Sequence, residues 1–395
     1  MIDQIKLSAK QELFQRLALE GKSIFLSGKA GTGKSFITKI VMDALRKEGK
    51  KVVAIAPTGI AANNVGGQTI HSMFNLNPFG VMDFESCNFL RGEKRRLLQS
   101  IDTIFIDEIS MLRPDILDGM HWTLLKNGCK GLDSKQIIFV GDFKQLPPVI
   151  NDNTRSVLYR TYDGDRMFDA KIYPKINAVV LDLDEILRQS DTEFIEALNL
   201  CREGKKAGYF RQFVGSEPNN GIVLAPYNAT VASYNSAGLN KLKGEEFIFD
   251  ALIEGNLKAD DFNLETVVRV KNGAKIMYLA NSKDAPLFNG TLGAFVSFKG
   301  QHYIRVNEID YPLEPLKFSK KEYVLNKVSN DLELEEVGSI EQMPIRLAYA
   351  LSIHKSQGMT FDEVTVDLTR SCFVKEQLYV ALSRVRTPEG LRILV

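Results

Sequence analysis

The segment GKAGTGKS, residues 28–35, constrains the fold of this 395-residue chain more than any other part of its sequence. It follows the apolar run SIFLSG, which is typical of a buried strand, and it precedes apolar residues spaced as on one helical face. A glycine-rich turn in this context lets backbone N–H groups approach phosphate oxygens, and the helix N-terminus favours their negative charge. Lys34 can reach the β- and γ-phosphates, and Ser35 can bind Mg²⁺. We therefore predict a nucleotide site formed by Gly28, Ala30, Gly31, Thr32, Gly33, Lys34 and Ser35, with ATP and Mg²⁺ as cofactors.

The rest of the first 150 residues repeats the alternation of short apolar strands and helices. Further strands are expected at residues 52–56, 103–107 and 137–141. Such alternation predicts an α/β fold in which helices cover a parallel sheet. We expect this first domain to span residues 1–178.

A second strand-and-helix series begins near residues 179–183 and resumes at residues 222–226. It ends with a strand at residues 363–368, a helix and the final strand RILV, and it contains no phosphate loop of its own. We expect a second α/β domain made of residues 179–242 and 341–395.

Two insertions interrupt these domains. Between residues 243 and 340 apolar and polar residues alternate with period two, which predicts a small β-barrel, and Asn289-Gly290 is a strong hairpin signal. Residues 75–100 interrupt the first domain and combine Phe79, in a turn-forming tip, with the basic stretch 91–96. Phe79 is either presented to a ligand or packed as a cap on the core.

Composition excludes several classes of protein. The 50 Lys and Arg residues balance 49 Asp and Glu residues, so any nucleic-acid site must be a local groove on a nearly neutral chain. No apolar run approaches the roughly 18 residues that span a bilayer, and the N-terminus lacks an apolar signal core. The four cysteines are far apart, without zinc-ligand spacing or a dense disulfide framework. We expect a cytoplasmic protein with reduced thiols and no membrane partner.

Polar residues that follow the strands are candidates for catalysis. Asp107 and Glu108 end an apolar strand at the edge where parallel sheets bind ligands. Beside a phosphate loop, Asp107 is expected to hold Mg²⁺ and Glu108 to deprotonate the attacking water, whereas a helix cap is the alternative. Gln145, in GDFKQLPP, can sense the γ-phosphate, although this loop alone would be interpreted as a simple turn. Arg188 and Arg384 follow a strand and a helix of the second series, and spacing alone would leave them as surface residues.

Two segments have the composition of a nucleic-acid contact. SIHKSQGMTF, residues 352–361, gathers His, Lys, Ser, Gln and Gly in one loop, which suits contacts with a phosphate backbone. His71, in GQTIHSMF, lies among hydroxyl groups and an aromatic residue, although a lone histidine is more often structural.

Taken together and in this order, these segments resemble the superfamily 1B DNA helicases of the PIF (petite integration frequency) family. The resemblance runs from Gln11 to the C-terminus through GKAGTGKS, APTGIAANNVGGQTIHSMF, IDEISML, GDFKQLPPV, LRQSDTEFIEALNLCREG, IHKSQGMTFDEVTVDL and EQLYVALSRVRTPEGL. It implies two RecA-like P-loop NTPase domains and an SH3-like β-barrel at residues 243–340 inserted in the second. The turn-forming tip and the basic residues of the insertion at 75–100 themselves predict a short wedge in the first.

The resemblance also implies roles for single residues. Gln11 would read the adenine, Arg188 and Arg384 would act as arginine fingers on the γ-phosphate, and Gln357 and Gly358 would also contact the nucleotide. From the sequence of its own turn, we expect Phe79 to separate the strands of a fork, with a cap on the hydrophobic core as the alternative. The residues expected at single-stranded DNA are Thr58, Gly59, Thr69, His71, Phe79, His354, Lys355 and Ser356.

These features predict an ATP-dependent DNA helicase, monomeric without DNA, that translocates 5′ to 3′ on single-stranded DNA and unwinds forked duplex DNA. G-quadruplexes and RNA–DNA hybrids are further candidate substrates, and a bacterial or phage source is expected. The alternatives are a RecD-like helicase, a P-loop kinase and a binder that uses ATP only to gate its affinity for nucleic acid. A kinase needs no second motor-like domain, and a gate needs no catalytic base such as Glu108.

Overall fold

The computed structural model describes residues 7–29, 31–77, 80–148, 150–184, 191–205, 208–255, 257–282, 284–326, 329 and 331–395. The chain divides into two compact units. The first unit comprises Met1–Arg188 and Lys320–Val337, and the second comprises Gln189–Ser319 and Gly338–Val395. Within the described residues, no helix combines the length and apolar character needed to cross a bilayer.

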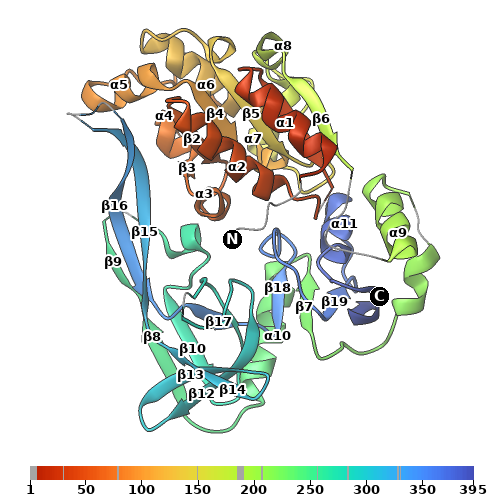
Figure 1. Ribbon diagram of the computed structural model, residues 1–395. Helices are drawn as coiled ribbons and strands as arrows, with labels where there is room; N and C mark the ends of the chain where they lie inside the picture. Colours follow the sequence, from red (N-terminus) through yellow and green to blue (C-terminus); the bar gives the residue numbers. More distant parts are fainter. Residues whose placement is uncertain are drawn as a thin grey trace. The chain divides into compact units, whose positions relative to one another are not determined.

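A six-stranded parallel sheet organises the first unit, with the strand order β3-β2-β4-β5-β1-β6 (Figure 1). Its strands are β1 (Ile24–Gly28), β2 (Val52–Ala56), β3 (Gln68–Thr69), β4 (Thr103–Ile106), β5 (Gln136–Gly141) and β6 (Val179–Leu183). Its helices are α1 (Ala9–Leu19), α2 (Lys34–Lys47), α3 (Gly59–Val65), α4 (Ile70–Phe74), α5 (Gly92–Ser100), α6 (Pro114–Lys126), α7 (Asp152–Leu158) and α8 (Tyr173–Ile176). The α/β alternation predicted for this part of the chain is confirmed.

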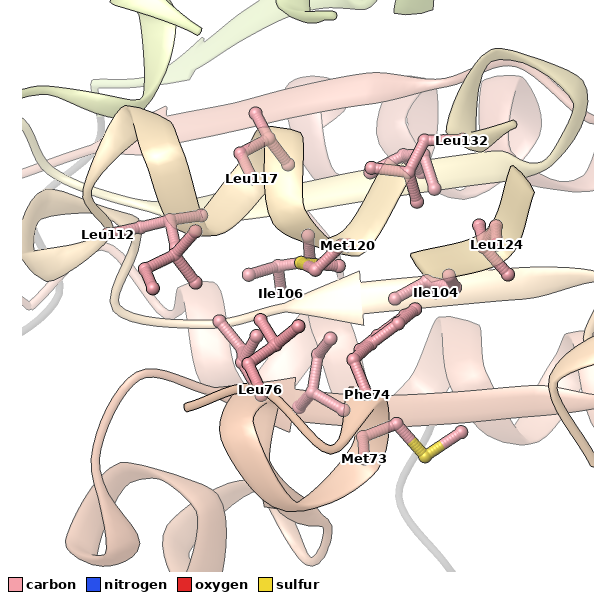
Figure 2. Packing of buried hydrophobic residues seen from close by; sticks show 14 of the residues in the cluster. Met73, Phe74, Leu76, Ile104, Ile106, Leu112, Leu117, Met120, Leu124 and Leu132 are labelled. Carbon is pink, nitrogen blue, oxygen red and sulfur yellow. The ribbon is translucent and has the colours of Figure 1, made fainter. Parts of the chain in front are cut away.

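Alternating side chains of the strands pack on opposite faces of this sheet, as the two-residue period of a strand requires. Ile24 and Leu26 of β1 lie in a buried cluster with residues of α1 and α2, whereas Phe25 lies in the cluster on the other face. Figure 2 shows this second cluster, in which Phe74 of α4 and Met120 of α6 pack against Ile104 and Ile106 of β4. Both faces are covered by helices, which explains why the strand sequences are almost continuously apolar.

The strand at residues 179–183 belongs to a different domain from the one expected. We predicted that it begins the second domain, but β6 pairs with β1 in parallel, from Ile24↔Val179 to Gly28↔Leu183. The sheet of the first unit therefore extends past residue 178, and the first unit continues to Arg188. An apolar strand at the edge of a sheet has the same local sequence whichever sheet it joins, so the assignment depends on long-range pairing.

A four-stranded parallel sheet, with the order β18-β7-β19-β20, forms the α/β part of the second unit. Its strands are β7 (Ile222–Ala225), β18 (Ala350–Ser352), β19 (Val364–Asp367) and β20 (Leu391–Leu394). Helices α9 (Thr192–Arg202), α10 (Asn228–Asn240) and α11 (Glu376–Leu382) accompany it, and α10 packs on β7 and β18.

The stretch predicted as a β insertion is indeed built from antiparallel strands (Figure 1). One sheet has the order β14-β13-β12-β11-β17, β8 pairs with β10, and β15-β16-β9 form a third sheet. The bounds are β8 (Glu246–Asp250), β9 (Leu252–Glu254), β10 (Val267–Lys271), β11 (Lys275–Tyr278), β12 (Leu292–Phe298), β13 (Gln301–Val306), β14 (Ile309–Leu313), β15 (Leu316–Leu325), β16 (Leu332–Gln342) and β17 (Ile345–Leu347). Buried residues of β10 to β14 and of β17, among them Val268, Ile276 and Phe295, form one core cluster.

Two tight hairpins of this stretch form at residue pairs other than Asn289-Gly290. Lys299 and Gly300, with φ of +52° and +77°, form the two-residue connection between β12 and β13, where Phe298 pairs with Gln301. Residues 307 and 308 connect β13 to β14 in the same way. Gly290 also has a positive φ, of +100°, but its turn lies in the longer connection between β11 and β12.

Residues 320–337 lie far along the sequence and yet complete the first unit. Tyr323 is buried in the same cluster as Phe74 and Ile104, and Leu325 and Leu332 pack against that cluster. The Tyr323 hydroxyl accepts a hydrogen bond from Ala54 N at 3.1 Å, and Tyr323 N donates to Gln68 Oε1 at 2.6 Å. The first unit is therefore built from two separate segments of the chain.

Candidate nucleotide and DNA sites

The phosphate loop connects β1 to α2, as predicted. Gly31 and Gly33 have φ of +84° and +77°, in the left-handed region that side chains other than glycine rarely adopt. Lys34, the first residue of α2, donates hydrogen bonds to Gly28 O at 2.7 Å and Lys29 O at 3.0 Å. Its ammonium group is thus held over the loop, whose backbone and helix N-terminus form a cradle suited to phosphate.

Asp107 and Glu108 follow β4 at the same edge of the sheet as this loop, because β4, β5 and β1 are parallel neighbours. Burial raises the pKa of Asp107, while the hydrogen bond from Glu108 N, at 2.8 Å, and the charge of Lys34 lower it. Glu108 has φ +49°, a left-handed conformation that is uncommon for a residue with a side chain. Glu108 directly precedes the short 3-10 helix Ile109–Met111, and backbone conformations of this kind are common at functional sites.

The glutamine-bearing loop follows β5, between the two strands just described. Asp142 and Gln145 are both buried, at 1% and 8% exposure. The Asp142 carboxylate accepts from Lys144 N at 3.0 Å, and Gln145 N donates to Asp142 O at 2.9 Å. The turn is therefore rigidly held, and it places Gln145 at the same sheet edge as Lys34.

The residues expected at a Mg²⁺ ion fit such an ion. Ser35 is exposed in the first turn of α2, and the Asp107 carboxylate lies at the adjacent sheet edge, so both offer the oxygen ligands that Mg²⁺ prefers. A cation beside Asp107 would offset the burial that raises its pKa. In the described part of the chain, no group of three or more His, Cys, Asp and Glu side chains forms a protein-only metal site.

Gln11 has a structural partner. Its side-chain oxygen accepts from Ser8 N at 3.0 Å, while Gln11 N donates to Ser8 Oγ at 3.4 Å, so the pair caps the N-terminus of α1. Gln11 is 5% exposed. Contact with an adenine, which we predicted, would have to use its amide nitrogen or replace this cap.

The candidate DNA residues of the first unit follow β2 and β3. The hydroxyls of Thr58 and Thr69 cap α3 and α4 by accepting from Ala61 N and Ser72 N. Gly59 begins α3. These residues share the carboxyl edge of the sheet with the phosphate loop but lie on neighbouring strands, so one edge presents both candidate sites.

His71 lies in α4 and is partly buried. Burial lowers its pKa, the charge of Arg113 lowers it further, and Asp115 opposes both. Arg113 Nε donates to Asp115 Oδ1 at 2.9 Å, and Asp115 is fully buried. His71 is therefore a neutral imidazole near pH 7, which would contact DNA by hydrogen bonding or stacking.

The loop after β18 carries the candidate residues of the second unit. His354 and Lys355 are partly exposed, but Ser356 is fully buried and donates its hydroxyl to Ile353 O at 2.8 Å. Our expectation that Ser356 faces DNA does not fit this position, because its side chain holds the loop together. Gly358 has φ +77°, and Gln357 Nε2 is a buried donor with no partner among the described residues.

Arg384 follows α11 and is 2% exposed. Its guanidinium donates to Val380 O at 2.8 Å, Ser383 Oγ at 2.7 Å and Met359 O at 3.2 Å. Sequence spacing suggested an exposed arginine, whereas the structure shows one that joins α11 to the loop of residues 354–359. A role as an arginine finger would require the guanidinium to exchange these bonds for phosphate oxygens.

Three predicted residues lie outside the described part of the chain: Ala30, Phe79 and Arg188. Of the described residues in the insertion at 75–100, Leu76, Leu90 and Leu97 are buried in the large cluster of the first unit, whereas Phe84 and Phe89 are exposed.

The sequence analysis missed the contribution of residues 320–337 to the DNA motif GQTIHSMF. Besides the bond between Tyr323 and Gln68, Glu322 accepts a hydrogen bond from Ser72 Oγ and lies 3.8 Å from Lys94 Nζ. A buried tyrosine at one position of a period-two strand is a weak signal, and nothing local shows which core it enters.

Comparison with known proteins identifies the family. The sequence profile of the PIF1-like helicases matches residues 6–206. ATP-dependent DNA helicase Pif1 of Campylobacter jejuni is 30% identical, over 94% of this chain and 88% of the relative. ATP-dependent DNA helicase PIF1 of Xenopus laevis is 32% identical over the whole of this chain, which spans only 62% of that relative.

Solved structures agree with the sequence comparison. The structure of Bacteroides sp. Pif1 with ADP-AlF4 superimposes with a TM-score of 0.87 at 31% identity, covering 99% of this chain and 92% of that chain. Candida albicans Pif1 gives a TM-score of 0.71 at 27% identity, covering 99% and 95%. The predicted RecA-like α/β fold is confirmed, while the SH3-like character of the β insertion stays a prediction. The chain belongs to the PIF1-like helicase family.

Proposed function

We propose that this chain is an ATP-dependent DNA helicase that moves 5′ to 3′ on single-stranded DNA and separates duplex DNA at forks. The main support is that one carboxyl edge of the first sheet carries both candidate sites. Lys34, Asp107 and Glu108 lie at this edge, as do Thr58 and Thr69. The Bacteroides relative, 31% identical to this chain, has been crystallised with single-stranded DNA, and a related structure describes forked duplex DNA.

Each group at the nucleotide edge has a distinct part in hydrolysis. The loop amides and Lys34 bind the phosphates, and Gln145 senses the γ-phosphate from its rigid turn. Mg²⁺, held by Ser35 and Asp107, would neutralise phosphate charge. Glu108, in the turn that follows β4, accepts a proton from the attacking water.

Domain movement couples this chemistry to stepping. ATP binding draws the units together, and Arg188 and Arg384 then act on the γ-phosphate, where such a residue contributes roughly 10³ to 10⁵ in rate. Arg384 donates hydrogen bonds to Ser356 O and Met359 O, in the loop that also carries His354 and Lys355. A movement of Arg384 toward the γ-phosphate would therefore shift the loop proposed to contact DNA. Gln357, with its unpartnered buried amide, is a second group in this loop suited to a nucleotide oxygen. We propose that the enzyme is a monomer before it binds DNA.

A strand-displacement assay tests this proposal. The chain is incubated with ATP, Mg²⁺ and duplexes that carry either a 5′ or a 3′ single-stranded tail, and the released strand is quantified. We expect release from 5′-tailed duplexes only, together with an ATPase activity that single-stranded DNA stimulates. Release from 3′-tailed duplexes would overturn the polarity. An ATPase that ignores DNA would instead favour a P-loop kinase.

A further inference from the structure

Four side chains that no site described above uses as a group lie together in the second unit: Tyr227, His354, Arg370 and Phe373. Tyr227 follows β7, His354 follows β18, and Arg370 and Phe373 follow β19. Because β18, β7 and β19 are adjacent parallel strands, all four residues lie at one carboxyl edge of the sheet. We call them the ring cluster.

The rings are close enough to support one another. The ring centroids of His354 and Phe373 are 5.6 Å apart with only 10° between the planes, an offset stack. Tyr227 lies 5.6 Å from Phe373, and the Arg370 guanidinium lies 4.5 Å from the centre of the Tyr227 ring. Burial lowers the pKa of His354, so its imidazole is neutral near pH 7 and stacks as an uncharged ring.

Phe373 is held in place and still open to solvent. It is 52% exposed, although it is in contact with two other rings. Its backbone N–H donates to Gln377 Oε1 at 3.0 Å, which ties it to α11. An ordered aromatic ring exposed at a sheet edge presents a ready surface to a ligand and loses little side-chain freedom when one binds.

Phe373 also lines a cavity of about 710 Å³ in the second unit. This volume lies within the range of about 300–1,000 Å³ typical of small-ligand sites and is ample for a nucleobase. Apolar walls and basic side chains both occur among its lining residues, which include Leu378, Leu382, Ile393, Lys205, Arg211 and Lys375. An apolar wall with nearby cations suits a flat, uncharged base attached to phosphate groups.

Resting on the proposed function, we propose that Phe373 stacks against one base of the bound single strand, at the mouth of this cavity. Tyr227 and His354 support the ring from behind. Arg370 and Lys375, both exposed, lie where they can pair with the phosphates that flank this base. Stacking on a phenyl ring requires a base but no particular base, so the contact suits a motor that must move along any sequence.

The experiment removes the base and the ring separately. A fluorescent oligothymidine of about 12 nucleotides, within the size range of one single-strand site, is made as a series with one abasic position moved along the strand. Binding to the full chain is measured by anisotropy without nucleotide. At one position we expect the abasic change to raise the Kd roughly tenfold. A change of this size corresponds to the loss of one base–aromatic stack.

Variants of Phe373 then identify the ring responsible. Phe373→Leu and Phe373→Ala should bind the intact strand roughly tenfold more weakly and become insensitive to the abasic position, while Phe373→Tyr should behave as the parent. The matched control is Phe298→Ala, which removes a ring of 63% exposure that also lies beside a cation, from Lys299. It should keep the parent's abasic pattern.

Two results would overturn the inference: a parent enzyme with no abasic-sensitive position, or Phe373 variants that keep the parent's sensitivity at that position. Should both Phe373 substitutions lower the melting temperature, binding is measured at a temperature at which the variants stay folded, so that their abasic sensitivity still identifies the ring. Failure of the proposed function is distinguishable, because the intact strand would then neither bind nor stimulate ATP hydrolysis.

Discussion

The Lys34 ammonium group donates hydrogen bonds to two carbonyl oxygens of its own loop, Gly28 O and Lys29 O. These bonds hold the side chain over the site where phosphate is expected, so little rotamer freedom is left to lose when nucleotide binds. Bonds to phosphate oxygens are charge-assisted on both sides and stronger than bonds to neutral carbonyls, which favours the exchange. The same charge lowers the pKa of Asp107 and opposes the effect of its burial.

Paired substitutions at Lys34 and Glu108 should separate binding from chemistry. Lys34→Ala removes a charge that contacts phosphates before and during reaction, so both ATP affinity and turnover should fall. Glu108→Gln keeps size and polarity but cannot take a proton, so ATP and DNA should bind normally while turnover falls by about 10² or more. Titration with a fluorescent ATP analogue and single-turnover hydrolysis measure the two effects. Near-parent hydrolysis by Glu108→Gln would exclude it as the base.

The positions of residues in short local motifs could be predicted from the sequence, whereas contacts that depend on distant partners could not. The glycines, Lys34 and the Asp107–Glu108 pair belong to short motifs with fixed positions after a strand. Arg384 and Ser356 also stand in recognisable motifs, yet burial decides what their side chains touch. Arg384 bonds Met359 O, which lies in a different loop, and no periodicity of α11 shows that contact.

At the scale of elements, the sequence of β15 does not show which hydrophobic core this strand packs against. Most of its residues are half-buried, two of its lysines are exposed, and Tyr323 enters the core of the first unit. The Tyr323 hydroxyl accepts a bond from the amide of Ala54, in the middle of β2. A strand from a distant part of the chain thus satisfies a buried donor of the parallel sheet.

Tyr323→Phe should destabilise the first unit by about 1–3 kcal/mol, because it leaves the buried amide of Ala54 without an acceptor while the ring still fills its place. Urea unfolding measures the loss. Tyr303→Phe is the matched control, since its hydroxyl bonds Gln301 Oε1 at the surface and should cost less than about 0.5 kcal/mol. Equal losses in the two variants would contradict the role assigned to Tyr323.

Turn chemistry at Asn289-Gly290 is borne out, because Thr291 N donates to Phe288 O at 2.9 Å and closes a turn between the antiparallel strands β11 and β12. Asn289-Gly290 carries the sequence preferred in two-residue hairpins, and a second hairpin, between β12 and β13, forms at Lys299-Gly300. Both pairs place glycine at a position with positive φ, so the local preference is similar. The two turns lie at opposite ends of β12, and the pairing of the buried residues Phe295 and Ile304 sets the register of the second hairpin.

Across the whole molecule, all four histidines share one electrostatic property. Burial lowers the pKa of His71, His121, His302 and His354 below the ordinary value of 6.5. The folded chain therefore holds them neutral at a pH where the unfolded chain takes up protons. By linkage, their contribution to stability is complete above 6.5 and is lost as pH falls from there toward the folded values.

We expect the urea midpoint to fall between about pH 7.5 and 5.5, a window above most carboxylate titrations. Replacing His71 or His302 by Gln removes one protonation site from the unfolded state, so each variant should lose less stability across this window than the parent. Chemical denaturation at several pH values gives the slopes. A variant with the parent's slope would show that its histidine does not take part.

The assembly of the first unit from Met1–Arg188 and Lys320–Val337 has a consequence for how the protein is made. A nascent chain that has released its first 188 residues from the ribosome still lacks Tyr323, Leu325 and Leu332, which pack in that unit's core. The unit reaches its final packing only after much of the second unit has been translated. We expect chains that terminate before residue 320 to form an incomplete core and not an autonomous ATP-binding fragment. The unit that is translated first therefore completes its folding late.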